Sequence, residues 1–171
     1  MGEHMPHTHT PPAPGQSRPF HFQTRWQLPA SAARVWEVLA DVGAWPQWWP
    51  GVTNVTVLDS GNVPHGAGTR AQVLVASPVG YRLRFTIHIC DVEHPWVAHI
   101  DVTGDLQGHG LWRVIYGDES TTHTVVELTW CVVTARKAVR ALRPVAGVAH
   151  AHVMSGGQRG LITRLAEQGQ L

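Results

Sequence analysis

The sequence predicts an α+β domain in which a curved, seven-stranded antiparallel sheet wraps around one long C-terminal helix. Three observations carry this prediction. Apolar and polar residues alternate from Phe20 to Gln27, which is the period of a half-buried strand. Six further alternating stretches follow Gly51, and an apolar helical face runs through residues 144–168.

The composition fits one folded, soluble domain. A chain of 171 residues with 43% hydrophobic and 15% charged residues is too apolar for disorder. No apolar run approaches the roughly 18 residues of a membrane span, so stable membrane insertion is not expected. The net charge of +1 argues against nucleic acid as a partner. Two cysteines and the lack of an apolar signal-peptide core favour a cytoplasmic location.

The first 19 residues are rich in Pro, Thr, His and Gly, which predicts a disordered tail that contributes little to stability. His4, His7 and His9 lie there, but a flexible segment gives a metal no fixed geometry. The folded domain is expected over residues 20–168, with a short C-terminal end at 169–171.

Two short helices are expected after the first strand. Pro29 ends that strand, and Ser31 is placed to cap a helix whose apolar residues recur at the spacing of one buried face. Prolines bracket residues 44–51, so this segment holds only a turn or two of helix, with three Trp rings that must pack against nearby elements.

Turn residues separate the later strands, and most of the turns are short enough for antiparallel hairpins. The glycines within residues 104–108 are interpreted as turn formers. The six later strands are expected at Val52–Leu58, Thr69–Ala76, Tyr81–Val92, Trp96–Val102, Leu111–Tyr116 and Thr122–Thr134.

Four parts of the chain carry a family resemblance through their order and spacing: Leu28–Asp41 with Trp45–Pro50, Gly104–Trp112, Val126–Trp130 and His150–Leu165. Together they resemble the START-like (SRPBCC) helix-grip superfamily, and in particular its polyketide cyclase/dehydrase branch. The resemblance implies a helix-grip fold over residues 20–168. It also implies a mostly apolar cavity between the sheet and the C-terminal helix, which would hold a small hydrophobic molecule such as a lipid or a polyketide.

Side chains on one face of the strands and of the last helix are the candidates for the cavity wall. Each ring among them is explained either by core packing or by ligand contact. The candidate ligand-binding residues are Trp48, Phe85, Ile87, Trp112, Val114, Tyr116, Leu128, Trp130, His150, Met154, Gly157 and Leu161.

The C-terminal helix carries two informative positions on the face expected to contact the sheet. His150 is either a neutral, hydrogen-bonded core histidine or a polar group of the cavity. His152 lies about 200° further round the helix, so the two histidines cannot bind one metal. Gly157 is costly inside a helix, which indicates room for a ligand, close approach of a Trp ring, or a tolerated weakness.

Other polar residues give weaker signals. Cys90 and Cys131 are expected to be structural, and His99 and Asp101 to face solvent. A basic cluster is interpreted as a solvated face, with attraction of an anionic head group as the alternative. Its members are Arg136, Lys137, Arg140 and Arg143.

Two functions stay open at this point. No phosphate loop, G-x-S-x-G, H-E-x-x-H or C-x-x-C motif is present, so no cofactor and no metal are expected. The favoured function is binding of a small hydrophobic ligand, and the alternative is an enzyme of the cyclase or dehydratase type. A cavity with one or two polar groups favours binding, whereas a perturbed histidine beside an Arg or a carboxylate favours catalysis.

Overall fold

Seven strands form one antiparallel sheet in the computed structural model, which describes residues 12–61, 63–117, 120 and 122–169. The strand order is β1-β7-β6-β5-β4-β3-β2, so β1 and β2 form the two edges. The strands are β1 Phe20–Leu28, β2 Val52–Asp59, β3 Arg70–Ala76, β4 Arg82–Glu93, β5 Val97–Gly104, β6 Gln107–Tyr116 and β7 Thr124–Val133. The predicted α+β, helix-grip class is confirmed.

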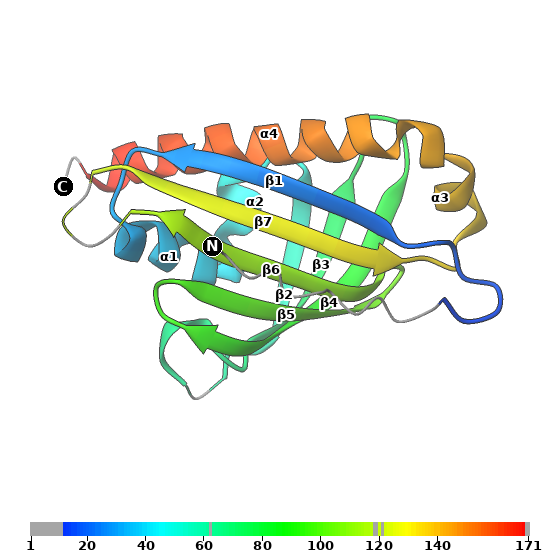
Figure 1. Cartoon of the computed structure of the whole chain (residues 1–171), viewed down its shortest axis with the longest axis horizontal. Helices are drawn as coiled ribbons and strands as arrows, with labels where there is room; N and C mark the ends of the chain where they lie inside the picture. Colours follow the sequence, from blue (N-terminus) through cyan, green and yellow to red (C-terminus); the bar gives the residue numbers. More distant parts are fainter. Residues whose placement is uncertain (1–11, 62, 118–119, 121, 170–171) are drawn as a thin grey trace, which may run out of the picture.

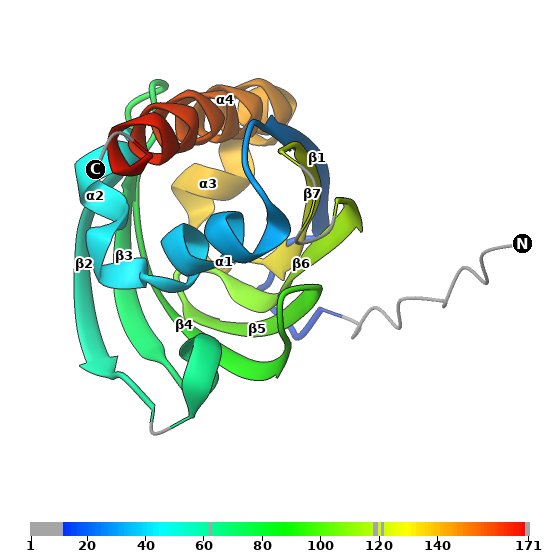
Figure 2. The same cartoon turned by 90° about the vertical axis from the view of Figure 1, so that its left-hand side faces the viewer.

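The long helix α4 (Arg143–Gln168) lies across the open side of the curved sheet, along the length of β1 (Figures 1 and 2). Within the described part of the chain, no helix is both long and apolar enough to cross a membrane. The shorter helices are α1 Ala32–Ala40, η1 Val42–Ala44, α2 Trp45–Trp48, η2 Pro64–Gly66 and α3 Lys137–Ala141.

Local sequence signals account for several of these elements. The Ser31 hydroxyl accepts a hydrogen bond from the Arg34 N–H at 3.5 Å, which confirms the expected helix cap. On β4, Leu83, Phe85 and Ile87 are all buried, as the alternation predicts. The concave face of the sheet is therefore apolar along this strand.

Strand β6 begins at Gln107, four residues before its predicted start. Gly108 was interpreted as a turn former, but it pairs with Val132 within the sheet. Its φ of +145° and a distance of 2.2 Å from an ideal Cβ to the Cys131 carbonyl oxygen show why only glycine fits. Gly104, with φ +113°, ends β5 as expected of a turn position.

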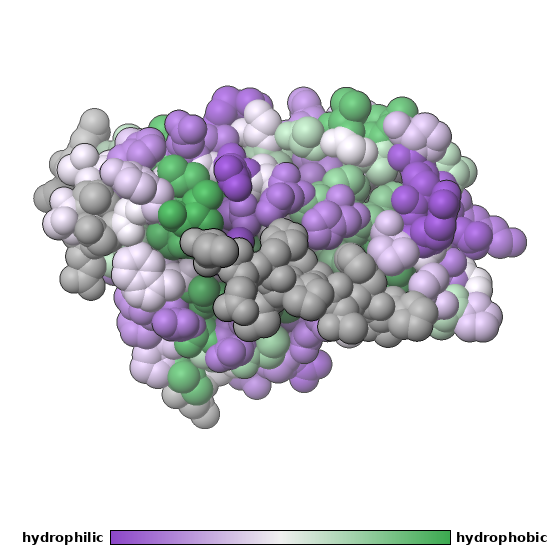
Figure 3. Space-filling view, viewed as in Figure 1, coloured by the Kyte–Doolittle hydropathy of each residue, from purple (hydrophilic) through white to green (hydrophobic). Residues whose placement is uncertain are grey.

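Residues 15–19, which the sequence analysis assigns to a disordered tail, contact the folded domain in the structure. The Ser17 N–H donates to the Thr134 carbonyl at 2.8 Å, and the buried Ser17 hydroxyl accepts from the Thr134 N–H at 3.1 Å. The Arg140 guanidinium donates to the Gly15 carbonyl at 3.2 Å. Figure 3 shows strongly hydrophilic residues gathered over α3, where this segment enters β1. His4, His7 and His9 lie outside the described residues.

Three members of the predicted basic cluster thus have structural partners. The Arg143 guanidinium lies 4.0 Å from the centre of the Phe20 ring and also donates to the Arg18 carbonyl. Arg136 pairs with Asp105, with 2.8 Å between Nη1 and Oδ2. These arginines therefore attach the N-terminal segment and the β5–β6 turn to the part of the chain that contains α3 and the start of α4.

A candidate ligand cavity

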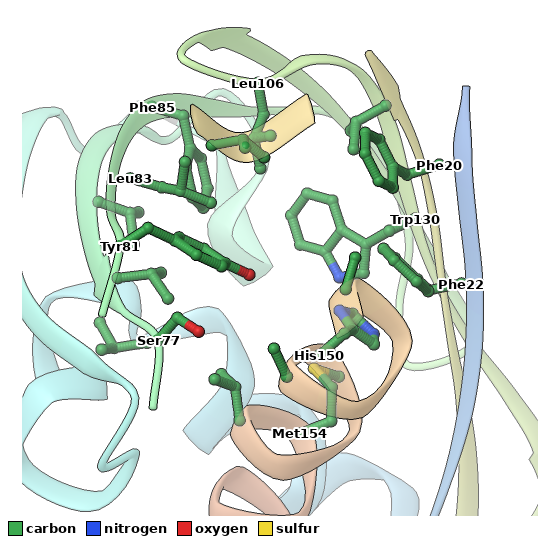
Figure 4. A pocket seen from close by; sticks show the side chains of 18 of the residues that line it. Phe20, Phe22, Ser77, Tyr81, Leu83, Phe85, Leu106, Trp130, His150 and Met154 are labelled. Atoms are coloured by element: carbon green, nitrogen blue, oxygen red, sulfur yellow. The ribbon is translucent and has the colours of Figure 1, made fainter. Parts of the chain in front are cut away.

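An apolar cavity of about 130 Å³ lies between the concave face of the sheet and α4 (Figure 4). Its wall combines side chains of β1, β2, β3, β4, β7, α2, α3 and the first half of α4. Four of the candidate residues line it, namely Phe85, Trp130, His150 and Met154. These four come from three separate elements, β4, β7 and α4, which the fold brings together around one cavity.

His150 is the most informative side chain of the wall. Its ring stacks on Phe22, with 4.2 Å between ring centres and 12° between planes. Its Nε2 atom is buried and has no hydrogen-bond partner among the described residues. Burial lowers the pKa of His150 from 6.5 to about 4, so the ring is neutral at pH 7. The expectation of a neutral histidine agrees with this burial, whereas a hydrogen bond at Nε2 is not formed.

Two hydroxyl groups face His150 across the cavity. Figure 4 shows the side-chain oxygens of Ser77 and Tyr81 directed into the same space as the His150 ring. Ser77 Oγ accepts a hydrogen bond from the Val79 N–H at 3.3 Å. No Arg, Lys, Asp or Glu is among the described residues that line the cavity. His150 thus lacks the charged neighbour that acid–base chemistry would favour.

Several other candidates lie elsewhere on the concave face. Trp112 and Val114 border a separate space of about 10 Å³ beside α1. The Trp112 ring packs between Trp36 and Trp45, at 6.4 and 5.9 Å between ring centres. This tryptophan cluster fills the half of the sheet that faces α1 and α2, and that half leaves no room for a ligand.

The remaining candidates are core or surface residues. Tyr116 is 60% exposed, because a register shift between Val114 and Tyr116 turns the end of β6 away from the concave face. Gly157 contacts tryptophan rings instead of the cavity. The candidates buried in the core without lining the cavity are Trp48, Ile87, Leu128 and Leu161.

The sequence analysis did not select several residues of the wall. Phe20 and Phe22 line the cavity from β1, and their alternation is visible in the sequence. Tyr81 begins the expected strand Tyr81–Val92 in phase with Leu83 and Phe85, so its alternation is also visible in the sequence. Ser77 lies in the β3–β4 turn, where no periodic signal predicts its position.

The other polar candidates lie outside the cavity. His99 and Asp101 are on the exposed face of β5, and Asp101 lies 3.0 Å from His109, between Oδ1 and Nδ1. His152 is exposed and borders a separate surface hollow beside Pro50 and Ser77. Burial raises the pKa of the Cys131 thiol. A search of the described residues finds no group of His, Cys, Asp and Glu that could hold a metal ion.

A curved sheet that grips a long helix over an apolar cavity defines a helix-grip domain of the START type. The chain belongs to the family described as polyketide cyclase / dehydrase and lipid transport, whose model matches residues 28–153. The predicted family is therefore confirmed. A comparison with curated proteins gives no match.

Solved structures share this fold at low identity. The aromatase/cyclase Zhui from Streptomyces sp. R1128 has a TM-score of 0.70 and 18% identity, covering 88% of this chain and 96% of that one. The protein TTHA0849 from Thermus thermophilus has 0.69 and 19%, covering 87% and 99%. A START superfamily protein from Mycobacterium smegmatis has 0.68 and 13%, covering 86% and 98%.

Proposed function

We propose that this protein binds a small, mostly apolar molecule in the cavity, with one polar atom of the ligand bonded to Nε2 of His150. The observation that carries the proposal is the buried Nε2, which has no partner among the described residues. A buried polar atom without a hydrogen bond costs about 1–3 kcal/mol. A ligand that supplies the missing bond recovers part of that cost.

The chemistry of the wall favours binding over catalysis. A general acid or base works best with a pKa near the working pH, and burial holds that of His150 at about 4. The described wall supplies no carboxylate, the group that would raise this pKa. The family also fits this function, since its description includes lipid transport.

Cys90 and Cys131 form no disulfide with each other, which fits the cytoplasmic location that we also propose.

The volume of the cavity limits how much of a ligand it can enclose. At about 130 Å³ it is close to the cavities of roughly 150 Å³ that bind benzene in other proteins. One or two aromatic rings, or a short alkyl chain, are therefore the expected occupants. A longer molecule must extend through the mouth of the cavity.

Binding of 1-naphthol, followed by its fluorescence, tests this function. Ala149 lines the cavity, so Ala149→Leu should fill it and weaken binding at least about tenfold. Ala151 is exposed two residues further along α4, and Ala151→Leu is the matched control that should bind like the unchanged protein. A folded Ala149→Leu protein with normal 1-naphthol affinity would show that the ligand site lies elsewhere.

A second comparison tests the role of His150. The substitution His150→Phe keeps a ring for stacking on Phe22 but removes the hydrogen bond. It should weaken 1-naphthol binding about five- to tenfold, as expected for the loss of one hydrogen bond. Binding of 1-methylnaphthalene, which has no hydroxyl, should not weaken. An equal effect on both probes would argue against a polar contact at Nε2.

A further inference from the structure

The cavity continues toward a second hollow on the outside of the molecule. Val75, Tyr81 and Leu83 line both spaces, and the outer hollow has a volume of about 730 Å³. At this boundary α3 contributes to both sides, with Val139 in the cavity and Ala138 in the outer hollow. The mouth of the cavity therefore lies between the start of β4 and α3. We call the outer hollow the mouth groove.

Positive charge dominates the mouth groove. Its charged lining residues are Arg82, Arg84, Arg136 and Asp105. The carboxylate of Asp105 is already engaged, since it accepts from the Arg136 guanidinium at 2.8 Å and from the Arg84 backbone N–H at 2.8 Å. Arg136 also donates to the Arg82 carbonyl at 2.9 Å. The ion pair between Arg136 and Asp105 carries no net charge. The remaining positive charges of the groove are the guanidinium groups of Arg82 and Arg84.

Arg82 and Arg84 have no acidic partner in the described part of the chain. Both are exposed on the face of β4 opposite Leu83 and Phe85, at the end of the strand that borders the groove, and their Cα atoms are about 7 Å apart. Their cross-strand neighbours on β3 are Ala76 and Leu74, which carry no charge. Two neighbouring guanidinium groups supply positive charge and several N–H donors, which can bind a carboxylate or a phosphate.

We propose that the ligand is an anionic amphiphile, whose apolar part enters the cavity and whose carboxylate or phosphate lies in the mouth groove against Arg82 and Arg84. This inference rests on the proposed function and adds the charge and the orientation of the ligand. The limited volume of the cavity supports it, because a ligand longer than one or two rings must extend beyond the cavity, and the groove shares Val75, Tyr81 and Leu83 with it.

Displacement of bound 1-naphthol by decanoate and by decan-1-ol tests the inference. The two competitors have the same chain length and differ in charge, so the unchanged protein should prefer decanoate by about tenfold. The double substitution Arg82→Gln/Arg84→Gln should abolish this preference and leave displacement by decan-1-ol unchanged. The matched control, Arg70→Gln/Arg164→Gln, changes the net charge equally outside the groove and should keep the preference.

The outcomes separate this inference from the proposed function. Equal displacement by both competitors, with normal 1-naphthol binding, would overturn the anionic ligand and leave the cavity site standing. Failure of the protein to bind 1-naphthol would overturn the proposed function itself. Vesicles of phosphatidylglycerol and of phosphatidylcholine distinguish the source of the anion. Arginine-dependent binding to phosphatidylglycerol vesicles without any decanoate preference would assign the groove to a membrane surface and overturn the inference.

Discussion

Gly157 sets how closely α4 approaches the tryptophans beneath it. A Cβ atom at this position would lie 2.6 Å from two atoms of the Trp49 ring and 2.9 Å from the Trp26 ring. The Trp49 indole N–H donates to the Val153 carbonyl of the same helix at 2.9 Å. Of the three explanations that the sequence allowed, close approach of a Trp ring is the one that the structure shows. No ligand is needed to explain this glycine.

The substitution Gly157→Ala should therefore destabilise the protein by about 1–2 kcal/mol, since crowding against two rings outweighs the gain in helix propensity. Gly156 is the matched control on the same helix. Its Cβ would meet Pro50 at an ordinary 3.7 Å, so Gly156→Ala should stabilise by up to about 1 kcal/mol. Urea unfolding of both variants measures the two effects. Stabilisation by both substitutions would show that the rings move aside freely.

At the scale of elements, the residues before β1 extend the edge of the sheet that β1 forms. It continues toward β7 through two hydrogen bonds between Ser17 and Thr134, and the arginines of α3 and α4 hold its carbonyl groups. Composition alone predicted disorder because these residues bury little apolar surface. Backbone hydrogen bonds and arginine contacts, which composition does not reveal, connect these residues to the domain in the structure.

Replacement of Ser17 by Ala tests this attachment. The change leaves the Thr134 N–H buried without its acceptor, which should cost about 1–3 kcal/mol of unfolding free energy. Ser60, whose hydroxyl forms no hydrogen bond among the described residues, provides the control, and Ser60→Ala should stay within about 0.5 kcal/mol of the unchanged protein. Thermal unfolding compares them. Equal midpoints for both variants would mean that the segment does not contribute to stability.

Strand β7 shows how one element serves two parts of the molecule. Trp130, Leu128 and Val126 share the concave face, as their alternation predicts. Of these three, only Trp130 lines the cavity, together with Val132 further along the strand, because Leu128 pairs with Trp112 and lies among the tryptophans. The position along the strand, and not the face, separates the candidate site from the core.

For the molecule as a whole, His150 links stability to pH. Its pKa is lowered from 6.5 to about 4 by burial, so the unfolded chain binds a proton more tightly than the folded protein does. The free energy of unfolding should be highest above pH 6.5 and should fall as the pH drops from 6.5 to 4. The expected loss from this group is up to about 3 kcal/mol.

Unfolding measured from about pH 7 to about pH 4 checks this dependence. The variant His150→Phe should lose most of the slope in this range, while His152→Phe, at an exposed position, should keep it. The buried carboxylate of Glu127 affects stability in a lower pH range than His150 does. Burial alone would raise its pKa, but hydrogen bonds from Arg113 and Arg25 outweigh that and lower it, so its contribution is lost only below about pH 4.5. An unchanged slope in His150→Phe would contradict the assignment to this histidine.

The sequence was sufficient to predict the α+β class, the order of the strands along the chain, the helix-grip family and the buried face of β4. These properties depend on periodicity, turn residues and caps, which are local and can be read along one chain. Phe85, Trp130, His150 and Met154 were found among the cavity residues for the same reason, since each lies on a face that periodicity assigns to the interior.

Only the tertiary structure decided where along those faces the cavity lies. Trp112 and Trp130 look alike in the sequence, yet the tryptophans of α1 and α2 fill the space at Trp112 and leave it open at Trp130. A register shift turned Tyr116 outward, and the β3–β4 turn brought Tyr81 to the mouth. The volume left between packed elements depends on contacts between residues distant in the sequence, and local periodicity carries no information about those contacts.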